Sequence, residues 1–310
     1  MKTPSTAAKI SAFIAICLFV FLELFFFKFN HHPLGWGGAV ILVLFGIWRI
    51  ATEKNAYQKG RIIVIVGTFA LFWGAMPLLF NVQIPIIGGQ WGAFPSIHTV
   101  GSLTFFGYMA LILLFGKRVD CGWCCPCVTA RETIGYPFRD RTVRSELWWR
   151  LRWLKMLSLA LLLIYLGFMI VDASTAYDRA GGFYYNAVTY SYYASFLIIP
   201  LTGNRLFCRI LCPFAALWGI LSVAGFYRIK AERERCTGCN ACTNVCDMGI
   251  PVARLVAEKG QIRTIECMGC GRCVSACPND VLRFHSFWAY IARAIPFKKP
   301  RKTDAAVPNP

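Results

Sequence analysis

The stretch CTGCNACTNVCDMGI, residues 236–250, recurs further along the chain as CMGCGRCVSACPNDV, residues 267–281. Both copies contain the spacing CxxCxxCxxxC, which places three thiolates on one tight loop and a fourth at the start of the next element. Two such loops hold two [4Fe–4S] clusters when they exchange their fourth cysteines. The spacing therefore predicts one cluster at Cys236, Cys239, Cys242 and Cys277, and a second at Cys267, Cys270, Cys273 and Cys246.

Zinc is the main alternative ligand for such a cysteine-rich segment. Zinc modules use paired CxxC units with wider gaps, whereas each run here is evenly filled by four cysteines. Gly238, Gly269 and Gly271 lie within the two loops, where the missing Cβ lets backbone amides approach the sulfurs and help set the reduction potential. We expect a small ferredoxin-like module at residues 232–282, built from short strands and loops around the two clusters.

The composition of the chain assigns most of it to a membrane. The 310 residues are 57% hydrophobic and 15% charged, with 25 Phe and a mean hydropathy of +0.52, which is too apolar for an ordinary soluble domain. Fifteen cysteines would suggest disulfides in an oxidising compartment, but most of them fall in segments that the charge pattern assigns to the cytoplasm.

Six apolar segments are long enough, or nearly so, to cross about 30 Å of hydrocarbon as helices. The first resembles a signal peptide, but its apolar run is long and no small-residue cleavage site follows, so we interpret it as a retained anchor. The second is short, and the sixth is polar on one side. We therefore expect a mainly α protein whose residues 1–203 form a six-helix transmembrane bundle. The predicted spans are residues 10–27, 34–50, 62–82, 98–116, 154–172 and 184–203.

The loops between these segments differ in charge. Loops 49–61 and 117–155 are rich in Lys and Arg, whereas loop 82–97 has no charged residue and loop 173–183 carries only one acidic and one basic side chain. The positive-inside rule then places both termini and the cysteine module in the cytoplasm, at the inner membrane of a prokaryote. The formal net charge of +18 is thereby attributed to orientation and lipid headgroup contact, without nucleic acid.

Two further segments predict structure at the membrane surface. Residues 204–231 are apolar with basic residues at both ends, which favours an amphipathic connector along the cytoplasmic interface over a seventh span. Residues 283–310 alternate aromatic and basic side chains and predict a basic amphipathic C-terminal tail. A simple solvated basic tail is the alternative for residues 298–302.

Two CxxxCP motifs lie outside the ferredoxin repeats, in CGWCCPC at 121–127 and CRILCP at 208–213. Each motif follows a predicted span on the cytoplasmic side and offers two thiols at i and i+4, on one face of a helix. We expect these thiols to converge into a third redox or metal site; the alternative is that they pack the helix ends, with proline fixing the chain direction. Cys124 and Cys127 could join that site or be spare. The expected ligands are Cys121, Cys125, Cys208 and Cys212.

Few ionisable residues fall in or beside the predicted spans. Glu23 lies inside the first span, and a carboxyl group in hydrocarbon is a functional candidate unless it reaches the interface. His31, His32 and His98 are candidates for contact with a quinone, although interfacial polar residues are the more common interpretation. The chain contains no dinucleotide-binding glycine pattern, phosphate loop or Ser/His/Asp set. It therefore offers no substrate site of its own.

The cysteine pattern, together with the connector FAALWGILSVAGFYRIKAERER, resembles the NapH/MauN-type membrane ferredoxins over residues 98–285, and more distantly the NosR and CcoG/RdxA proteins. Asp247 stands where that family has a proline, and the chain has six predicted spans where NapH-like proteins are described with four. The resemblance implies a membrane subunit that passes electrons between quinone and a partner oxidoreductase, cytochrome or iron–sulfur subunit.

Two other functions are compatible with the sequence. The CcoG-like resemblance implies an assembly or maintenance factor that reduces a metal centre or thiols during maturation of another enzyme. A scaffold whose clusters serve only to hold the fold is the third possibility.

Overall fold

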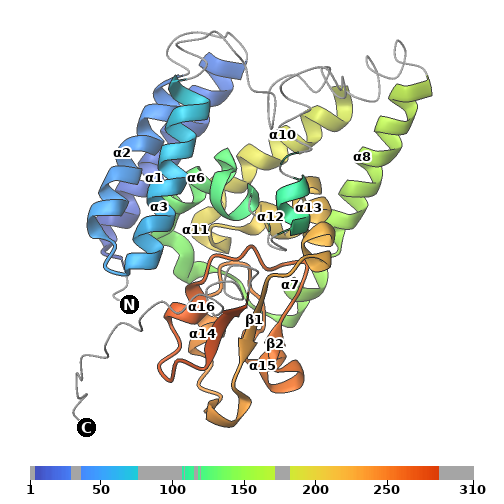
Figure 1. Ribbon diagram of the computed structural model, residues 1–310. Helices are drawn as coiled ribbons and strands as arrows, with labels where there is room; N and C mark the ends of the chain where they lie inside the picture. The colour runs from blue at the N-terminus through green and yellow to red at the C-terminus, as the bar shows by residue number, and fades with distance from the viewer. Residues whose placement is uncertain are drawn as a thin grey trace.

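The computed structural model describes residues 4–28, 36–75, 107, 109–114, 118, 120–171 and 182–285. Long helices form an upper layer, and the cysteine module lies against one side of it (Figure 1). The N-terminal end of the first helix points toward the module side, where the Lys9 ammonium pairs with the Asp140 carboxylate at 2.6 Å. The fold is mainly helical, as the sequence predicts.

Side-chain caps begin two of the long helices. Ser5 accepts a hydrogen bond from Ala8 N at 3.2 Å, and Asn55 accepts one from Gln58 N at 3.1 Å, so each satisfies an amide that the first turn leaves unpaired. Helices α1, α2 and α10 pack together around a core of Ala, Ile, Leu and Phe side chains. The long helical elements are α1 (Thr6–Phe21), η1 (Leu22–Lys28), α2 (Gly37–Thr52), α3 (Ala56–Phe69), η3 (Ala70–Ala75), α8 (Leu154–Val171) and α10 (Gly182–Leu197).

Helix occupies most of the described parts of the predicted spans. Spans 10–27, 34–50 and 154–172 fall on α1 with η1, on α2 and on α8, while most of span 98–116 lies outside the described residues. Among the described helices, Thr6–Phe26 is by itself long and apolar enough to cross a membrane, with a mean hydropathy of 2.3; Gly37–Thr52 and Pro213–Ala224 are apolar but shorter. The six-span bundle therefore stays a prediction.

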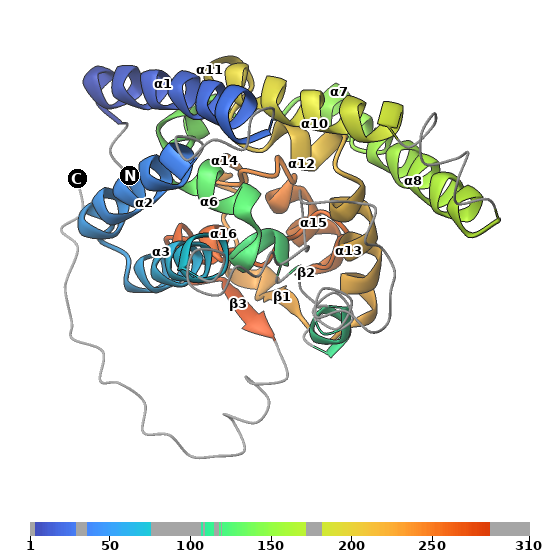
Figure 2. The ribbon, with the colours of Figure 1, turned by 90° about the horizontal axis from the view of Figure 1, so that it is seen from above.

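Short helices connect the long ones, and several of them lie between the long helices and the module (Figures 1 and 2). The connector predicted at 204–231 is two helices and a strand, because Pro213 cannot continue the hydrogen bonding of a preceding turn and instead starts a new helix. Cys125 and Cys212 hold the same position, each capping a helix that begins with proline. The short helices are η5 (Asp120–Cys124), α6 (Pro126–Glu132), η6 (Tyr136–Arg141), α7 (Glu146–Leu151), α11 (Ile199–Thr202), α12 (Leu206–Ile210) and α13 (Pro213–Ala224).

The cysteine module contains a three-stranded antiparallel sheet of order β2-β1-β3. Ile229 at its centre pairs with Ile262 on one side and Phe284 on the other, so apolar side chains meet on the buried face. Strand β1 lies before residue 232, and residues 286–310 of the predicted tail lie outside the described part of the chain. The elements are β1 (Arg228–Ala231), η8 (Arg233–Arg235), α14 (Ala241–Asn244), α15 (Val252–Lys259), β2 (Gln261–Ile262), α16 (Arg272–Ser275) and β3 (Leu282–His285).

The two cysteine motifs repeat their backbone conformation as well as their sequence. Gly238 and Gly269, at equivalent positions, have φ of 69° and 68°; Asn240 and Gly271, also equivalent, have φ of 58° and 72° and begin α14 and α16. These left-handed residues turn the chain sharply between successive cysteines. Each motif is therefore a tight loop followed by one turn of helix.

The Glu132 carboxylate joins the helical layer to the module. It is fully buried and pairs with Arg61 Nη2 at 3.0 Å, with Arg205 Nη2 at 2.5 Å and with Arg272 Nη2. Arg272 belongs to the second cysteine motif, whereas Arg61 and Arg205 lie in or before helices of the upper layer. Buried charges of this kind are stable only when they are paired. The network therefore fixes the module against the helices.

Two more buried acids serve the same interface. Asp247 lies 3.2 Å from Arg272 Nε and 3.7 Å from Arg139 Nε. Glu266, directly before the second motif, pairs with Lys155 Nζ at 2.5 Å and with Arg118 Nη2 at 3.7 Å. The position where the resembled family has proline is thus occupied by a carboxylate that binds the other motif's arginine.

These networks correct one expectation about the basic residues. Lys and Arg of the basic loops and of the connector were expected at the membrane surface, but eight of them are at most 8% exposed and lie inside the protein, where they meet carboxylates, carbonyl groups or rings. The expectation is wrong for these residues because buried acids and helix ends retain them. They are Arg49, Arg61, Arg118, Arg131, Arg139, Lys155, Arg205 and Arg209.

We expect Glu132→Ala to lower the free energy of unfolding by about 3–5 kcal/mol, because it leaves three buried guanidinium groups without their carboxylate. Glu146→Ala is the matched control: its pairs with Arg150 and Arg254 are exposed, so the loss should be below about 1 kcal/mol. Denaturant unfolding in detergent, followed by tryptophan fluorescence, measures both. Equal losses in the two variants would contradict the central place of Glu132.

Candidate iron–sulfur centres

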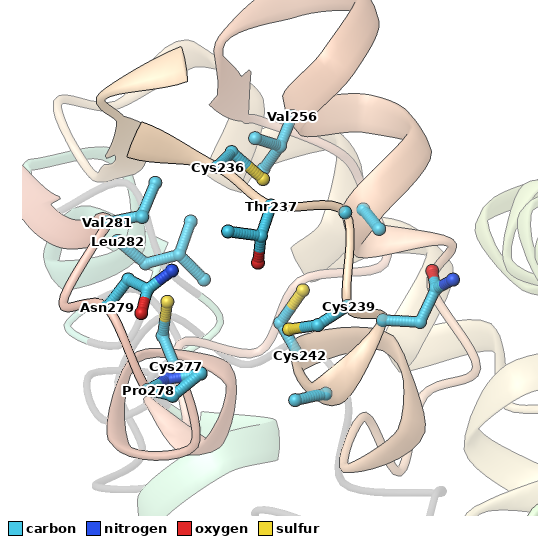
Figure 3. A pocket seen from close by; sticks show the side chains of 14 residues that line it. Cys236, Thr237, Cys239, Cys242, Val256, Cys277, Pro278, Asn279, Val281 and Leu282 are labelled. Carbon is cyan, nitrogen blue, oxygen red and sulfur yellow. The ribbon is translucent and has the colours of Figure 1, made fainter. Parts of the chain in front are cut away.

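Four of the predicted ligands line one pocket at the outer edge of the module (Figure 3). The sulfur atoms are turned toward a shared space, which Val281 and Leu282 close on one side. Cys236 and Cys239 lie in a run of exposed residues, 232–240. Cys277 comes from the second motif, so the chain brings this cysteine to the first motif as the sequence predicts for a fourth ligand. The four are Cys236, Cys239, Cys242 and Cys277; we call them the outer set.

The other four predicted ligands lie deeper and are called the inner set. They pack against the apolar core of the module, which includes Met248 and Met268. Their thiols are close enough to influence one another electrostatically: a charge on Cys267 or Cys270 raises the pKa of Cys246 and of Cys273. The inner set is Cys246, Cys267, Cys270 and Cys273.

The chemistry of the inner set fits a bound metal cluster. Burial raises the pKa of Cys246 to about 12 and of Cys267 and Cys270 to about 11, so as free thiols they keep their protons at neutral pH. Metal binding replaces those protons and holds the sulfurs as thiolates. The backbone amides of Gly269 and Ile250 hydrogen-bond to Cys267 and Cys246 and stabilise the charged form.

The spacing of the sulfur atoms differs from the spacing that a single metal ion requires. Among the described residues, no three His, Cys, Asp or Glu side chains converge tightly enough to ligate a single metal ion. A [4Fe–4S] cluster differs, because each cysteine ligates its own iron and the four sulfurs surround the group instead of meeting at a point. When bound there, such a cluster supplies one-electron redox chemistry.

The inner set faces the helical layer at close range. Gln58 Nε2 donates a hydrogen bond to the carbonyl oxygen of Cys270 at 2.9 Å. A Cβ atom added at Gly122 would lie 2.4 Å from the carbonyl oxygen of Met268, and one added at Gly271 would lie 2.6 Å from the Tyr57 ring. Only glycine permits this approach. The loop containing the first CxxxCP motif therefore touches the second ferredoxin motif directly.

The structure brings most of the CxxxCP cysteines together. Negative charge on Cys208, Cys121 or Cys127 acts on Cys212 and, together with burial, raises the pKa of that thiol well above its usual range. Cys212 Sγ also accepts a hydrogen bond from Ala215 N at 3.4 Å. Cys121 of the first motif therefore lies near Cys212 of the second.

Cys127, which the sequence left open, is among the cysteines whose charge acts on Cys212, and it also hydrogen-bonds to Tyr192. Cys125, which the sequence places in the site, is buried against Ile65 and Val128, and Cys127 packs against the same residues. The sequence prediction placed each cysteine pair on one helix, but a helix boundary separates Cys121 from Cys125 and likewise Cys208 from Cys212. In the sequence, the only feature that pointed to Cys127 was its position two residues after Cys125.

Of the ionisable residues that the sequence singles out in or beside the predicted spans, one lies in the described part of the chain and three lie outside it. Glu23 lies in η1, where Tyr193 hydrogen-bonds to it and where a Cβ atom at Gly38 would meet its carboxylate at 2.6 Å. His31, His32 and His98 lie outside the described residues. The role of these residues toward a quinone stays a prediction.

Family models match both parts of the cysteine framework. A model described as "4Fe-4S dicluster domain" matches residues 228–278, which hold the outer and inner sets. A model described as "4Fe-4S binding domain" matches twice, at residues 97–145 and 193–230. The second model thus covers each of the two CxxxCP segments.

Curated relatives match over large parts of the chain. The chain is 29% identical to "Putative electron transport protein YccM" of Escherichia coli over 66% of this chain and 60% of that protein. It is 26% identical to "Ferredoxin-type protein NapH" of Haemophilus influenzae over 60% of this chain and 70% of the relative. It is 35% identical to "Methylamine utilization ferredoxin-type protein MauN" of Methylorubrum extorquens over 44% of this chain and 51% of the relative.

No solved structure matches the chain. The doubled cysteine motif, the two CxxxCP segments and the relatives agree on one group of proteins. The chain belongs to the NapH/MauN-type family of ferredoxin-type iron–sulfur proteins.

Proposed function

We propose that the protein relays electrons between the quinone pool of a membrane and a partner redox protein. An iron–sulfur electron-transfer role is supported by the family models and relatives; the quinone and the partner are the proposal. The observation that carries it is the unequal depth of the two cysteine sets. The inner set adjoins the helical layer through Gln58 and Gly122, and the outer set reaches the surface at Cys236 and Cys239.

The contacts around each cysteine set support a path for electrons through the module, with the inner set on the membrane side and the outer set on the partner side. The inner set is enclosed by helical residues and by the networks of Glu132 and Glu266, so a soluble protein has little access to it. The outer set lies beside residues 232–240, all exposed. A partner protein would therefore approach the outer set, and membrane-held quinone would approach from the helical side.

Buried charge around the inner set favours reduction there. Arg61, Arg205 and Arg272 surround Glu132, and Lys155, Arg118 and Arg152 surround Glu266. Each acid is outnumbered by the cations that contact it. Positive charge in a poorly solvated site stabilises an added electron. The surroundings of the inner set would raise its reduction potential toward that of a quinone couple.

The assembly factor stays as the rival because cysteines gather outside the ferredoxin motifs, at Cys121, Cys208 and Cys212. A deletion strain separates the two functions. In a relay, the partner enzyme accumulates with its cofactors but is not reduced by quinol. In an assembly factor, the partner lacks a cofactor. Proteins that co-purify in mild detergent would identify that partner, which we expect to be an oxidoreductase, a cytochrome or an iron–sulfur subunit.

Substitution of one cysteine in each set tests the order of the relay. In proteoliposomes reduced with dithionite, a long-chain quinone in the bilayer should oxidise the inner cluster of Cys239→Ser as fast as that of the wild type, because only the outer set is altered. In Cys270→Ser, the outer cluster should be oxidised much more slowly, because its neighbour on the helical side is lost. Freeze-quench EPR follows both signals. Fast oxidation of the outer cluster in Cys270→Ser would contradict the proposed order.

Substitution of Arg272 tests whether the buried positive charge raises the reduction potential of the inner cluster. Arg272→Gln removes a buried positive charge beside the inner set, so the midpoint potential of the inner cluster should fall. Arg272→Lys keeps the charge, so its inner cluster should have a midpoint potential close to that of the wild type. The outer cluster serves as the internal reference and should not shift. EPR-monitored redox titration of the purified wild type and of the two variants measures the potentials of both clusters. An unchanged inner potential in Arg272→Gln would show that the charge excess does not act on the cluster.

A further inference from the structure

The cysteines outside the ferredoxin motifs lie between two hydrogen-bonded braces. The first brace runs from the residues before Cys121 to those after Cys212: Arg118 Nη1 donates to the carbonyl oxygen of Ala215 at 3.0 Å. Gly122 N in turn donates to the carbonyl oxygen of Arg118 at 2.9 Å. Cys121 and Cys212 are therefore held at the same end of the two segments.

The second brace joins the residues after Cys127 to those before Cys208. Arg131 Nη1 donates to the carbonyl oxygen of Asn204 at 2.7 Å, and Asn204 Nδ2 donates back to the carbonyl oxygen of Arg131 at 3.1 Å. The next residue on each side, Glu132 and Arg205, forms an ion pair at 2.5 Å. The two CxxxCP segments are thus fixed to each other on both sides of their cysteines.

The thiols between the braces are close to one another and screened from solvent. Cys208 is buried, and Cys121, Cys127 and Cys212 are half-buried. Four thiols, two from each segment, therefore share one region.

The braces also leave buried cationic groups without enough partners. Within the described part of the chain, Nε of Arg118, Arg131 and Arg205 and Nη2 of Arg118 make no hydrogen bond. Arg131 is fully buried, and no described carboxylate pairs with it. A buried guanidinium group needs an acceptor or a compensating charge. An anionic group among the thiols would supply both.

We propose that Cys121, Cys127, Cys208 and Cys212 together hold a third iron–sulfur cluster of the [4Fe–4S] class. Each CxxxCP segment supplies two thiolates, and the neighbouring arginines balance the negative charge of the ligated cluster. The match of both segments to a 4Fe–4S binding model supports the class of ligand. The two segments would make one site between them, and Cys125 would remain a helix cap.

The position of this site relative to the inner set follows from one contact. Gly122, next to Cys121, touches the carbonyl group of Met268, next to Cys267. The third site is therefore adjacent to the inner set, on its helical side. The proposal concerns a binding site and does not depend on quinone as the electron partner, so it goes beyond the proposed relay.

Iron content tests the proposal directly. Full-length protein purified without oxygen in mild detergent should contain about twelve irons and about twelve acid-labile sulfides per chain, at four of each per cluster. Cys127→Ser and Cys208→Ser should each lower both values to about eight, with the EPR signals of the two ferredoxin clusters retained. Those signals show that a variant is folded.

Cys124→Ser and Cys125→Ser are the matched controls and should keep the wild-type iron content. About eight irons in the wild type, or zinc in place of the additional iron, would overturn the proposal while leaving the relay intact. Loss of iron in Cys125→Ser but not in Cys127→Ser would overturn the ligand assignment. Alkylation of the native wild type gives a second measurement: the four proposed ligands should be protected until iron is removed, and their labelling before that would also overturn it.

Discussion

The buried carboxylate of Glu132 is the interaction on which the arrangement of this protein depends. It meets arginines from α3, from the start of the second CxxxCP segment and from the second ferredoxin motif. A charge without solvent must be paired, and each of these three arginines is buried as well. One acid therefore specifies how three distant segments meet, which packing of apolar side chains alone would leave less defined.

This junction determines where the cysteines lie. With the second ferredoxin motif held at Glu132 and Glu266, the inner set lies against the helices, and Cys236 and Cys239 of the outer set are exposed to solvent. The same junction brings Asn204 against Arg131 and so aligns the two CxxxCP segments. The greater exposure of Cys236 and Cys239 is thus a consequence of how the module is attached.

Charge balance explains the unusual number of buried cations. Soluble proteins rarely bury Arg or Lys without a matching acid, yet here Glu132 and Glu266 each face three cations. Ligated iron–sulfur clusters are anionic, so arginines beside cysteine thiolates complete the balance.

The sequence by itself determined the features that depend on local spacing and composition: the doubled ferredoxin motif, the family and the mainly helical fold. It could not determine which distant segments meet. The burial of basic residues expected at headgroups and the partner of Asp247 were both decided by tertiary structure. The physical reason is that a thiol or an arginine has the same sequence signature in any environment, whereas its neighbours come from segments far apart in the chain, such as those joined by Glu132.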